Sequence, residues 1–66
     1  MIGQIYRFDT HHSTWLVLVN KVYKKDDEEL VEFLDILYDN KFGTFFKNTS
    51  PLDSFKATFT EYHSKI

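Results

Sequence analysis

The segment from Trp15 to Tyr23 constrains the fold more than any other part of this chain. Its sequence, Trp-Leu-Val-Leu-Val-Asn-Lys-Val-Tyr, is rich in β-branched and aromatic residues and contains neither glycine nor proline. Such a run predicts a β-strand that is buried on both faces. A chain of 66 residues has room for a single core. We therefore expect this strand, over Thr14 to Lys24, to lie at the centre of one small β domain that spans residues 1–66.

The composition limits how such a small core can be stabilised. A chain of this length buries only about 60% of its unfolded surface, so it depends on dense packing, a cross-link or a partner. The sequence has no cysteine, which excludes disulfides and thiolate metal sites. Aromatic residues make up 18% of the chain and favour dense aromatic packing. A second copy of the chain is a further way to cover such a core.

The charge balance bears on the class of partner. Eight Lys and Arg against ten Asp and Glu give a formal net charge of -2. A protein that binds nucleic acid through phosphates normally carries a clear positive excess, so the balance argues against a general nucleic-acid binder. The first residues lack the pattern of a signal peptide, and the longest apolar run, Trp15 to Val19, is far too short to span a membrane. We expect a cytoplasmic protein without a membrane partner.

Further elements flank the central strand. Ile2 to Asp9 predicts a first strand that carries Tyr6 and Phe8 on one face. The polar run Asp9–Ser13 predicts a loop. The charged run Lys24–Glu29 predicts a turn or the start of a helix.

The segment from Leu30 to Gly43 has two interpretations. Apolar residues at i, i+3, i+4 and i+7, after a run of acids, favour a helix over Asp27 to Tyr38. The β-branched and aromatic content of Val31–Leu37 favours a strand, followed by a turn over Tyr38–Gly43 and another strand over Thr44–Lys47.

The C-terminal part begins with a helix-start pattern. Ser50 as N-cap, Pro51 at the first position and Asp53 at the third predict a helical turn over Pro51–Phe55. The alternation of apolar and polar residues that follows fits a closing strand equally well.

The order of these segments resembles that of the SH3-like small barrels found in short proteins of bacteria and phages. The resemblance is carried by five segments, in chain order: Gly3–Tyr6, Trp15–Val19, Val31–Leu34, Tyr38–Gly43 and Pro51–Phe55. It implies an all-β fold, a five-stranded antiparallel barrel with one short helical turn, and hence a strand over Leu30–Leu37. The alternative is a sheet packed by a helix over residues 27–38. The high content of Lys, Asn, Asp, Phe and Tyr also resembles that of proteins encoded by AT-rich phage genomes.

Few residues point to catalysis or metal binding. His11 and His12 follow Asp9, but adjacent side chains on an extended loop point in opposite directions and serve one metal ion poorly. Asp35 interrupts an apolar segment, where it either faces solvent, which is the more common case, or is a partly buried carboxylate. We expect no enzyme activity and no cofactor.

The aromatic residues near two lysines carry the remaining functional information. At least two of Phe42, Phe45 and Phe46 are expected in the core, but adjacent residues of a strand cannot both face the interior. The remaining ring, next to Lys41 and Lys47, is the kind of residue that anchors an interface.

These features predict a non-enzymatic binding module that docks on a protein partner, as a phage or accessory regulator of a host protein. The predicted partner-binding surface joins the Asp9–Ser13 loop to the Tyr38–Lys47 segment, and its residues are Arg7, His11, His12, Tyr38, Lys41, Phe42, Phe46 and Lys47. The main alternative is a nucleic-acid binder that uses Arg7, Lys41 and Lys47 with nearby aromatic rings. A metal-dependent hydrolase or nuclease built on His11 and His12 is the least favoured alternative.

Overall fold

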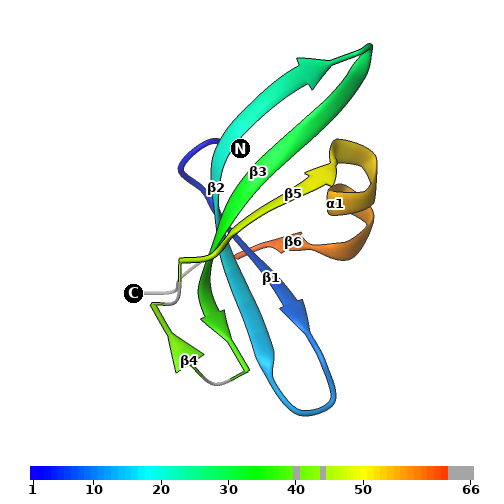
Figure 1. Ribbon diagram of the computed structural model, residues 1–66. Helices are drawn as coiled ribbons and strands as arrows, with labels where there is room; N and C mark the ends of the chain where they lie inside the picture. The colour runs from blue at the N-terminus through cyan, green and yellow to red at the C-terminus, as the bar shows by residue number, and fades with distance from the viewer. Residues whose placement is uncertain (40, 44, 63–66) are drawn as a thin grey trace.

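Two long antiparallel strands, β2 (Thr14–Lys25) and β3 (Glu28–Tyr38), form the centre of the fold (Figure 1). The structure is a computed structural model that describes residues 1–39, 41–43 and 45–62. The other elements, in chain order, are β1 (Ile5–Asp9), β4 (Lys41–Phe42), β5 (Lys47–Pro51), α1 (Leu52–Thr58) and β6 (Thr60–Glu61). No helix in the described ranges is long and apolar enough to span a membrane.

The strands form one antiparallel sheet that curls into a half-barrel (Figure 1). The strand order is β4-β3-β2-β1-β6, and β5 also pairs with β3. Strands β4 and β5 share one edge of β3: β5 pairs with its N-terminal half, and β4 with its C-terminal end. The expected all-β fold with one short helical segment is therefore confirmed, and the alternative helix over residues 27–38 is wrong.

The acidic run that favoured a helix start instead closes the β2–β3 hairpin. Lys25 pairs with Glu28, which leaves Asp26 and Asp27 as a two-residue loop. Their φ angles of 51° and 65° are both positive, as in the type I′ turns that match the twist of a hairpin. Aspartate tolerates this left-handed conformation better than most residues. The turn places apolar residues of the two strands opposite one another, such as Val22 and Val31. A sheet therefore forms where the 3.6-residue period had favoured a helix.

Two β-bulges bend the central pair of strands. The register between β2 and β3 shifts between Leu16 and Val17 and again between Val19 and Lys21, so Ile36 and Asn20 have no partner across the pair. An extra residue in one strand bends that strand and increases its local twist. These two bulges explain how a sheet of long strands curls into a half-barrel.

The core lies between α1 and one face of the sheet, here called the inner face. Its buried residues are Val17, Val19, Val31, Phe33, Phe55 and Phe59. Phe55 and Phe59 are one helical turn apart and stack with ring centroids 4.6 Å apart, and Phe33 lies 5.1 Å from Phe55. Tyr6 and Phe8 of β1 pack against this cluster, as their shared face predicted.

The opposite face of the sheet, here called the outer face, has no helix against it in Figure 1. Leu16 and Leu18 of β2 and Leu34 of β3 are only half-buried there. The prediction that the central strand is buried on both faces is therefore wrong. One helix of seven residues covers one face of a sheet, and an apolar run by itself does not tell which faces are covered.

Two of the predicted strands differ from the structure. The first strand begins at Ile5 and not at Ile2, because the chain turns at Gly3 (φ 81°) and the Gln4 amide donates to the carbonyl of Met1 at 3.0 Å. The strand predicted over Thr44–Lys47 is wrong, because residues 45–46 lie outside any strand. Phe45 has a φ of 52°, and β5 begins only at Lys47.

The predicted cap of the helix is also wrong. Ser50 belongs to β5, and its hydroxyl donates to the carbonyl of Pro51 at 3.0 Å rather than to a helical amide. Pro51 itself occupies the N-cap position without a side-chain hydrogen bond. The helix then continues past Phe55 to Thr58. This extra turn buries both Phe55 and the C-cap residue Phe59, which outweighs the alternation that favoured a strand.

Candidate functional site

A cavity of about 520 Å³ opens between the C-terminal end of β3, strand β4 and the start of β5. We call it the Asp35 cavity; its lining residues are Trp15, Asp35, Tyr38, Asp39, Lys41, Phe46 and Asn48. Its volume falls within the range of about 300–1,000 Å³ that is usual for ligand sites. Like those sites, it combines aromatic walls with a few polar groups.

Asp35 is the one charged residue of the described chain that is buried, with only 6% of its surface exposed. Its Oδ1 accepts hydrogen bonds from Trp15 Nε1 at 2.8 Å and from Asn48 Nδ2 at 2.9 Å. Its backbone is held as well: its amide donates to the Phe46 carbonyl at 3.1 Å, and its carbonyl accepts from the Phe45 amide at 2.9 Å. Of the two interpretations of Asp35, the solvent-facing one is wrong and the buried carboxylate is right, because Asp35 pairs with the core residue Val17 and so lies on the inner face.

The aromatic wall of the cavity depends on the bulge at Ile36. Without it, Tyr38 would lie on the opposite face from Asp35, since residues three apart in a strand point to opposite sides. The bulge shifts the alternation by one residue and turns Tyr38 toward the side of Trp15. The two rings then meet edge to face with centroids 5.1 Å apart. The Gly43 amide anchors the bulge by donating to the Ile36 carbonyl at 2.7 Å.

The open side of the cavity carries exposed groups. Phe46 is 70% exposed, and Tyr38 is 51% exposed. Lys41 is the cross-strand partner of Tyr38, and within 1–39, 41–43 and 45–62 it forms no ion pair. The lining thus contains two carboxylates, those of Asp35 and Asp39, and a single ammonium group.

The structure brings together three of the predicted partner-binding residues and separates the others. Tyr38, Lys41 and Phe46 line the Asp35 cavity. Three more lie on the outer face, because their cross-strand partners are outer-face leucines; these are Arg7 opposite Leu16, Phe42 opposite Leu37 and Lys47 opposite Leu34. Phe42, Phe45 and Phe46 are all exposed, so the expectation that at least two of them belong to the core is wrong.

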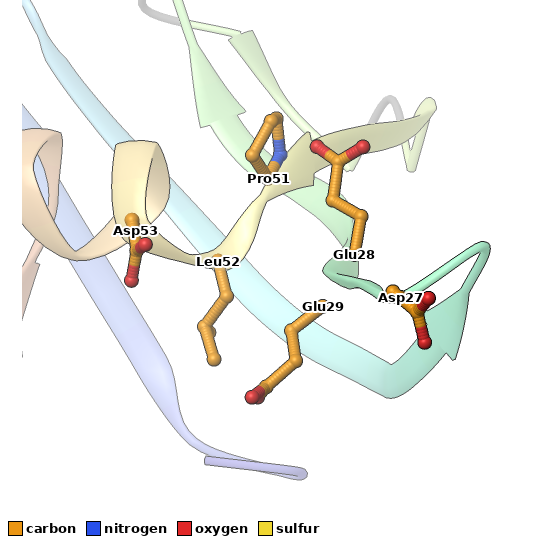
Figure 2. Close-up of a pocket in the computed structure, with 6 residues that line it drawn as sticks. All are labelled: Asp27, Glu28, Glu29, Pro51, Leu52 and Asp53. Carbon is orange, nitrogen blue, oxygen red and sulfur yellow. The ribbon is translucent and has the colours of Figure 1, made fainter.

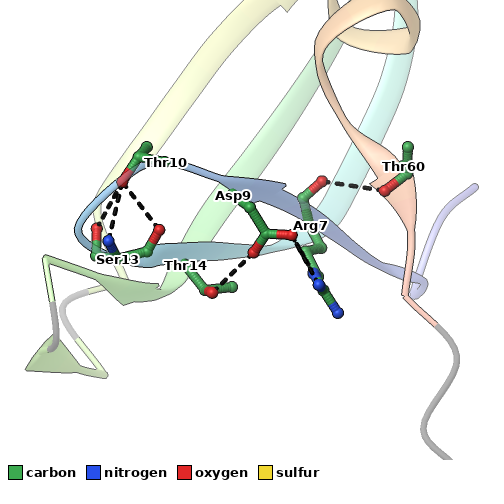
Figure 3. Close-up of polar contacts among 6 residues, drawn as sticks. All are labelled: Arg7, Asp9, Thr10, Ser13, Thr14 and Thr60. Carbon is green, nitrogen blue, oxygen red and sulfur yellow. Dashed lines mark hydrogen bonds and ion pairs between the residues drawn. The ribbon is translucent and has the colours of Figure 1, made fainter.

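The turn of the β1–β2 hairpin, residues 10–13, does not contribute to the cavity. Its turn is closed by Thr10, whose hydroxyl donates to the Ser13 carbonyl at 2.9 Å and accepts from the Ser13 amide at 3.0 Å (Figure 3). His11 and His12 lie exposed in this turn, and neither lines the Asp35 cavity. The predicted surface that joined this loop to the Tyr38–Lys47 segment is thus two separate regions.

Arg7 is already paired within its own strand. Its Nε donates to Asp9 Oδ2 at 2.8 Å, and Thr14 donates to the other oxygen of Asp9 at 2.8 Å (Figure 3). The hydrogen bond from Arg7, followed by that from Thr14, holds the pKa of Asp9 below its usual range. The same pair raises the pKa of Arg7. Both side chains are about half exposed, so the pair adds little to stability, but it occupies the guanidinium.

A second hollow of about 290 Å³ lies between the β2–β3 turn and the start of α1. Four carboxylates line it, those of Asp27, Glu28, Glu29 and Asp53, and Figure 2 shows them pointing in different directions. Over the described positions, no group of three or more acidic, histidine or cysteine side chains is arranged to hold a metal ion. This hollow therefore offers no convergent set of ligands.

The prediction from sequence missed four of the seven cavity residues: Trp15, Asp35, Asp39 and Asn48. An acid within an apolar segment was the one signal that could have found Asp35. Comparison of the chain with protein-family models, with curated proteins and with solved structures gives no match. The resemblance to SH3-like barrels accordingly stays a prediction.

Proposed function

We propose that this protein is a non-enzymatic binding module that docks on a protein partner through the rim of the Asp35 cavity. The observation that carries the proposal is the cavity itself, in which exposed Tyr38 and Phe46 flank a carboxylate that is buried and fixed. In keeping with the expectation from sequence, we propose a small regulator, of phage or accessory origin, that acts on a host protein.

The energetics of protein interfaces support this proposal. Interfaces gain most of their affinity from a few aromatic or arginine anchors surrounded by polar groups that exclude water. Here Phe46 and Tyr38 can anchor a partner, while Asp39 and Lys41 provide a polar rim. The hydrogen bonds of Asp35 hold Trp15 and Asn48 in place before a partner arrives, which lowers the entropy lost on binding.

The placement of the basic residues favours a protein partner over nucleic acid. Arg7 is paired with Asp9, and Lys47 lies on the outer face opposite Leu34. Lys41 lines a cavity that also contains two carboxylates. The three cations assigned to phosphate binding do not all lie on one face, whereas phosphate backbones are bound by several converging cations.

The test is affinity capture from the cell of origin with the tagged chain, followed by mass spectrometry of the bound proteins. Phe46→Ala is the test variant, and Phe42→Ala is its matched control, since Phe42 is a similarly exposed phenylalanine (75%) on the outer face. Both should keep the stability of the parent within about 0.5 kcal/mol, as surface substitutions usually do.

We expect a captured protein that is lost with Phe46→Ala and retained with Phe42→Ala. The complex should also tolerate added salt. Retention of the partner by both variants would overturn the proposal. So would capture of nucleic acid alone, with an affinity that falls steeply with salt, and that result would favour the nucleic-acid alternative.

A further inference from the structure

Among the described residues, the side-chain hydrogen bonds of Asp35 all go to one of its two oxygens, Oδ1. A carboxylate oxygen accepts about two hydrogen bonds, and Oδ1 already receives two, from Trp15 and from Asn48. No residue in 1–39, 41–43 or 45–62 donates to Oδ2. Buried polar atoms are nearly always paired, so an unpaired oxygen of a residue that lines an open cavity calls for a donor from outside.

The walls of the cavity suit the apolar part of that donor. Trp15, Tyr38 and Phe46 offer three aromatic rings around Asp35. Aromatic rings pack well against a methylene chain, and their faces attract a cation within about 6 Å of the ring centre. A ligand that combines a flexible methylene stem with a positively charged tip matches both features.

The charges of the cavity agree with a cationic ligand. Asp35 and Asp39 outnumber Lys41, so the lining carries one more negative than positive charge. Lys41 forms no ion pair with either carboxylate in the described structure, so its ammonium does not itself occupy the place of the ligand.

We infer that the Asp35 cavity binds the side chain of a lysine on the partner protein, with its ammonium donating to Asp35 Oδ2. This inference rests on the proposed function, because it names the group by which the partner is held. Lysine is favoured over arginine because only one oxygen of Asp35, Oδ2, is left to accept a hydrogen bond. An arginine fork binds a carboxylate through both oxygens, and Oδ1 is taken, whereas an ammonium is a compact donor that needs only one.

The direct test is a titration followed by ¹H–¹⁵N NMR. Trp15 is the only tryptophan, and its Nε1–H donates to Asp35, so its single indole signal reports on the site. The probes are the N-acetyl methylamides of lysine, arginine and norleucine, and uridine monophosphate. We expect the lysine probe to shift the Trp15 indole signal in a saturable way, with a Kd on the order of 1 mM. The uncharged norleucine probe should bind at least tenfold more weakly.

Variants place the binding at the cavity. Asp35→Asn should weaken the lysine probe at least tenfold, and Lys41→Gln should strengthen it two- to fivefold by removing a like charge (about 0.4–1 kcal/mol). Lys47→Gln is the matched control, because it removes a lysine from the outer face and should leave the affinity unchanged. If Asp35→Asn does not fold, the norleucine probe and Lys41→Gln still decide the question.

Equal affinity for the lysine and norleucine probes would overturn the inference, and so would tighter binding of arginine or of the nucleotide. A weaker affinity for the lysine probe in Lys41→Gln would also overturn it. Such a result would mean that the positive charge of Lys41 helps binding, as expected for an anionic ligand and not for a cationic one. The proposed function fails separately. If a captured partner is lost with Phe46→Ala but unaffected by Asp35→Asn and Lys41→Gln, the lysine inference is refuted. The proposed function as a docking module would still stand.

Discussion

The two hydrogen bonds to Asp35 Oδ1 allow a stability prediction that two substitutions can test. Asn at position 35 keeps an oxygen that can accept from both Trp15 and Asn48, but the bonds become neutral. Hydrogen bonds to charged groups contribute about 1.5–3 kcal/mol, and neutral ones about 0.5–1.5 kcal/mol, so each bond loses about 1 kcal/mol. Relief of the buried charge offsets part of this loss. We expect Asp35→Asn to lower the free energy of unfolding by about 1–2 kcal/mol.

Asp35→Ala should cost more, because it leaves the Trp15 and Asn48 donors without their acceptor. Both donors are half-buried, so water compensates in part, and we expect a loss of about 2–4 kcal/mol. A domain of this size has a total stability of about 3–10 kcal/mol, so this variant should be close to unfolding. The melting temperature should fall by about 4–8 °C for each kcal/mol lost.

The assay is urea denaturation followed by both circular dichroism and the fluorescence of the single tryptophan. Asp39→Asn is the control, since it makes the same chemical change at an exposed position whose φ of 51° asparagine also tolerates. It should change stability by less than about 0.5 kcal/mol. If Asp35→Ala proves as stable as the parent, the desolvation of the carboxylate outweighs its hydrogen bonds, and the argument is refuted.

Three further predictions follow from the described contacts. Phe55→Ala removes a ring that is 1% exposed and should cost about 3–5 kcal/mol, so thermal scans should show no cooperative transition near that of the parent. Replacing Asp26 and Asp27 by Asn-Gly should raise the free energy of unfolding by about 1 kcal/mol, because both positions have positive φ; a lower urea midpoint would contradict the turn assignment. Arg7 lowers the pKa of Asp9 in the folded protein. The small contribution of Asp9 to the free energy of unfolding is therefore present above its unfolded pKa near 3.8, and it is lost as the pH falls through the lower folded pKa. Asp9→Asn should therefore flatten the decline of stability between about pH 6 and about pH 2, and an unchanged acid profile would argue against the pair.

Local chemistry in the sequence was enough to predict much of the fold. The β-branched run after Trp15 predicted the central strand, which ends within one residue of its predicted end. The alternation at Tyr6 and Phe8 predicted their shared face, and both rings pack against the core. These features depend on side-chain periods and backbone preferences that act over a few residues, so a single sequence contains them.

The candidate site, by contrast, was decided by tertiary structure. Asp35 and Tyr38 share a face only because Ile36 is left out of the β2–β3 register, and a bulge of this kind has no mark in the alternation pattern. Phe46 lies outside a strand because β5 begins at Lys47, where pairing with β3 selects the register. One short helix can cover only one face of the sheet, so it determined which apolar residues of β2 are buried. The physical reason is that these choices depend on pairing and packing between segments far apart in the chain, and the strength of such contacts is set only when all of them form together.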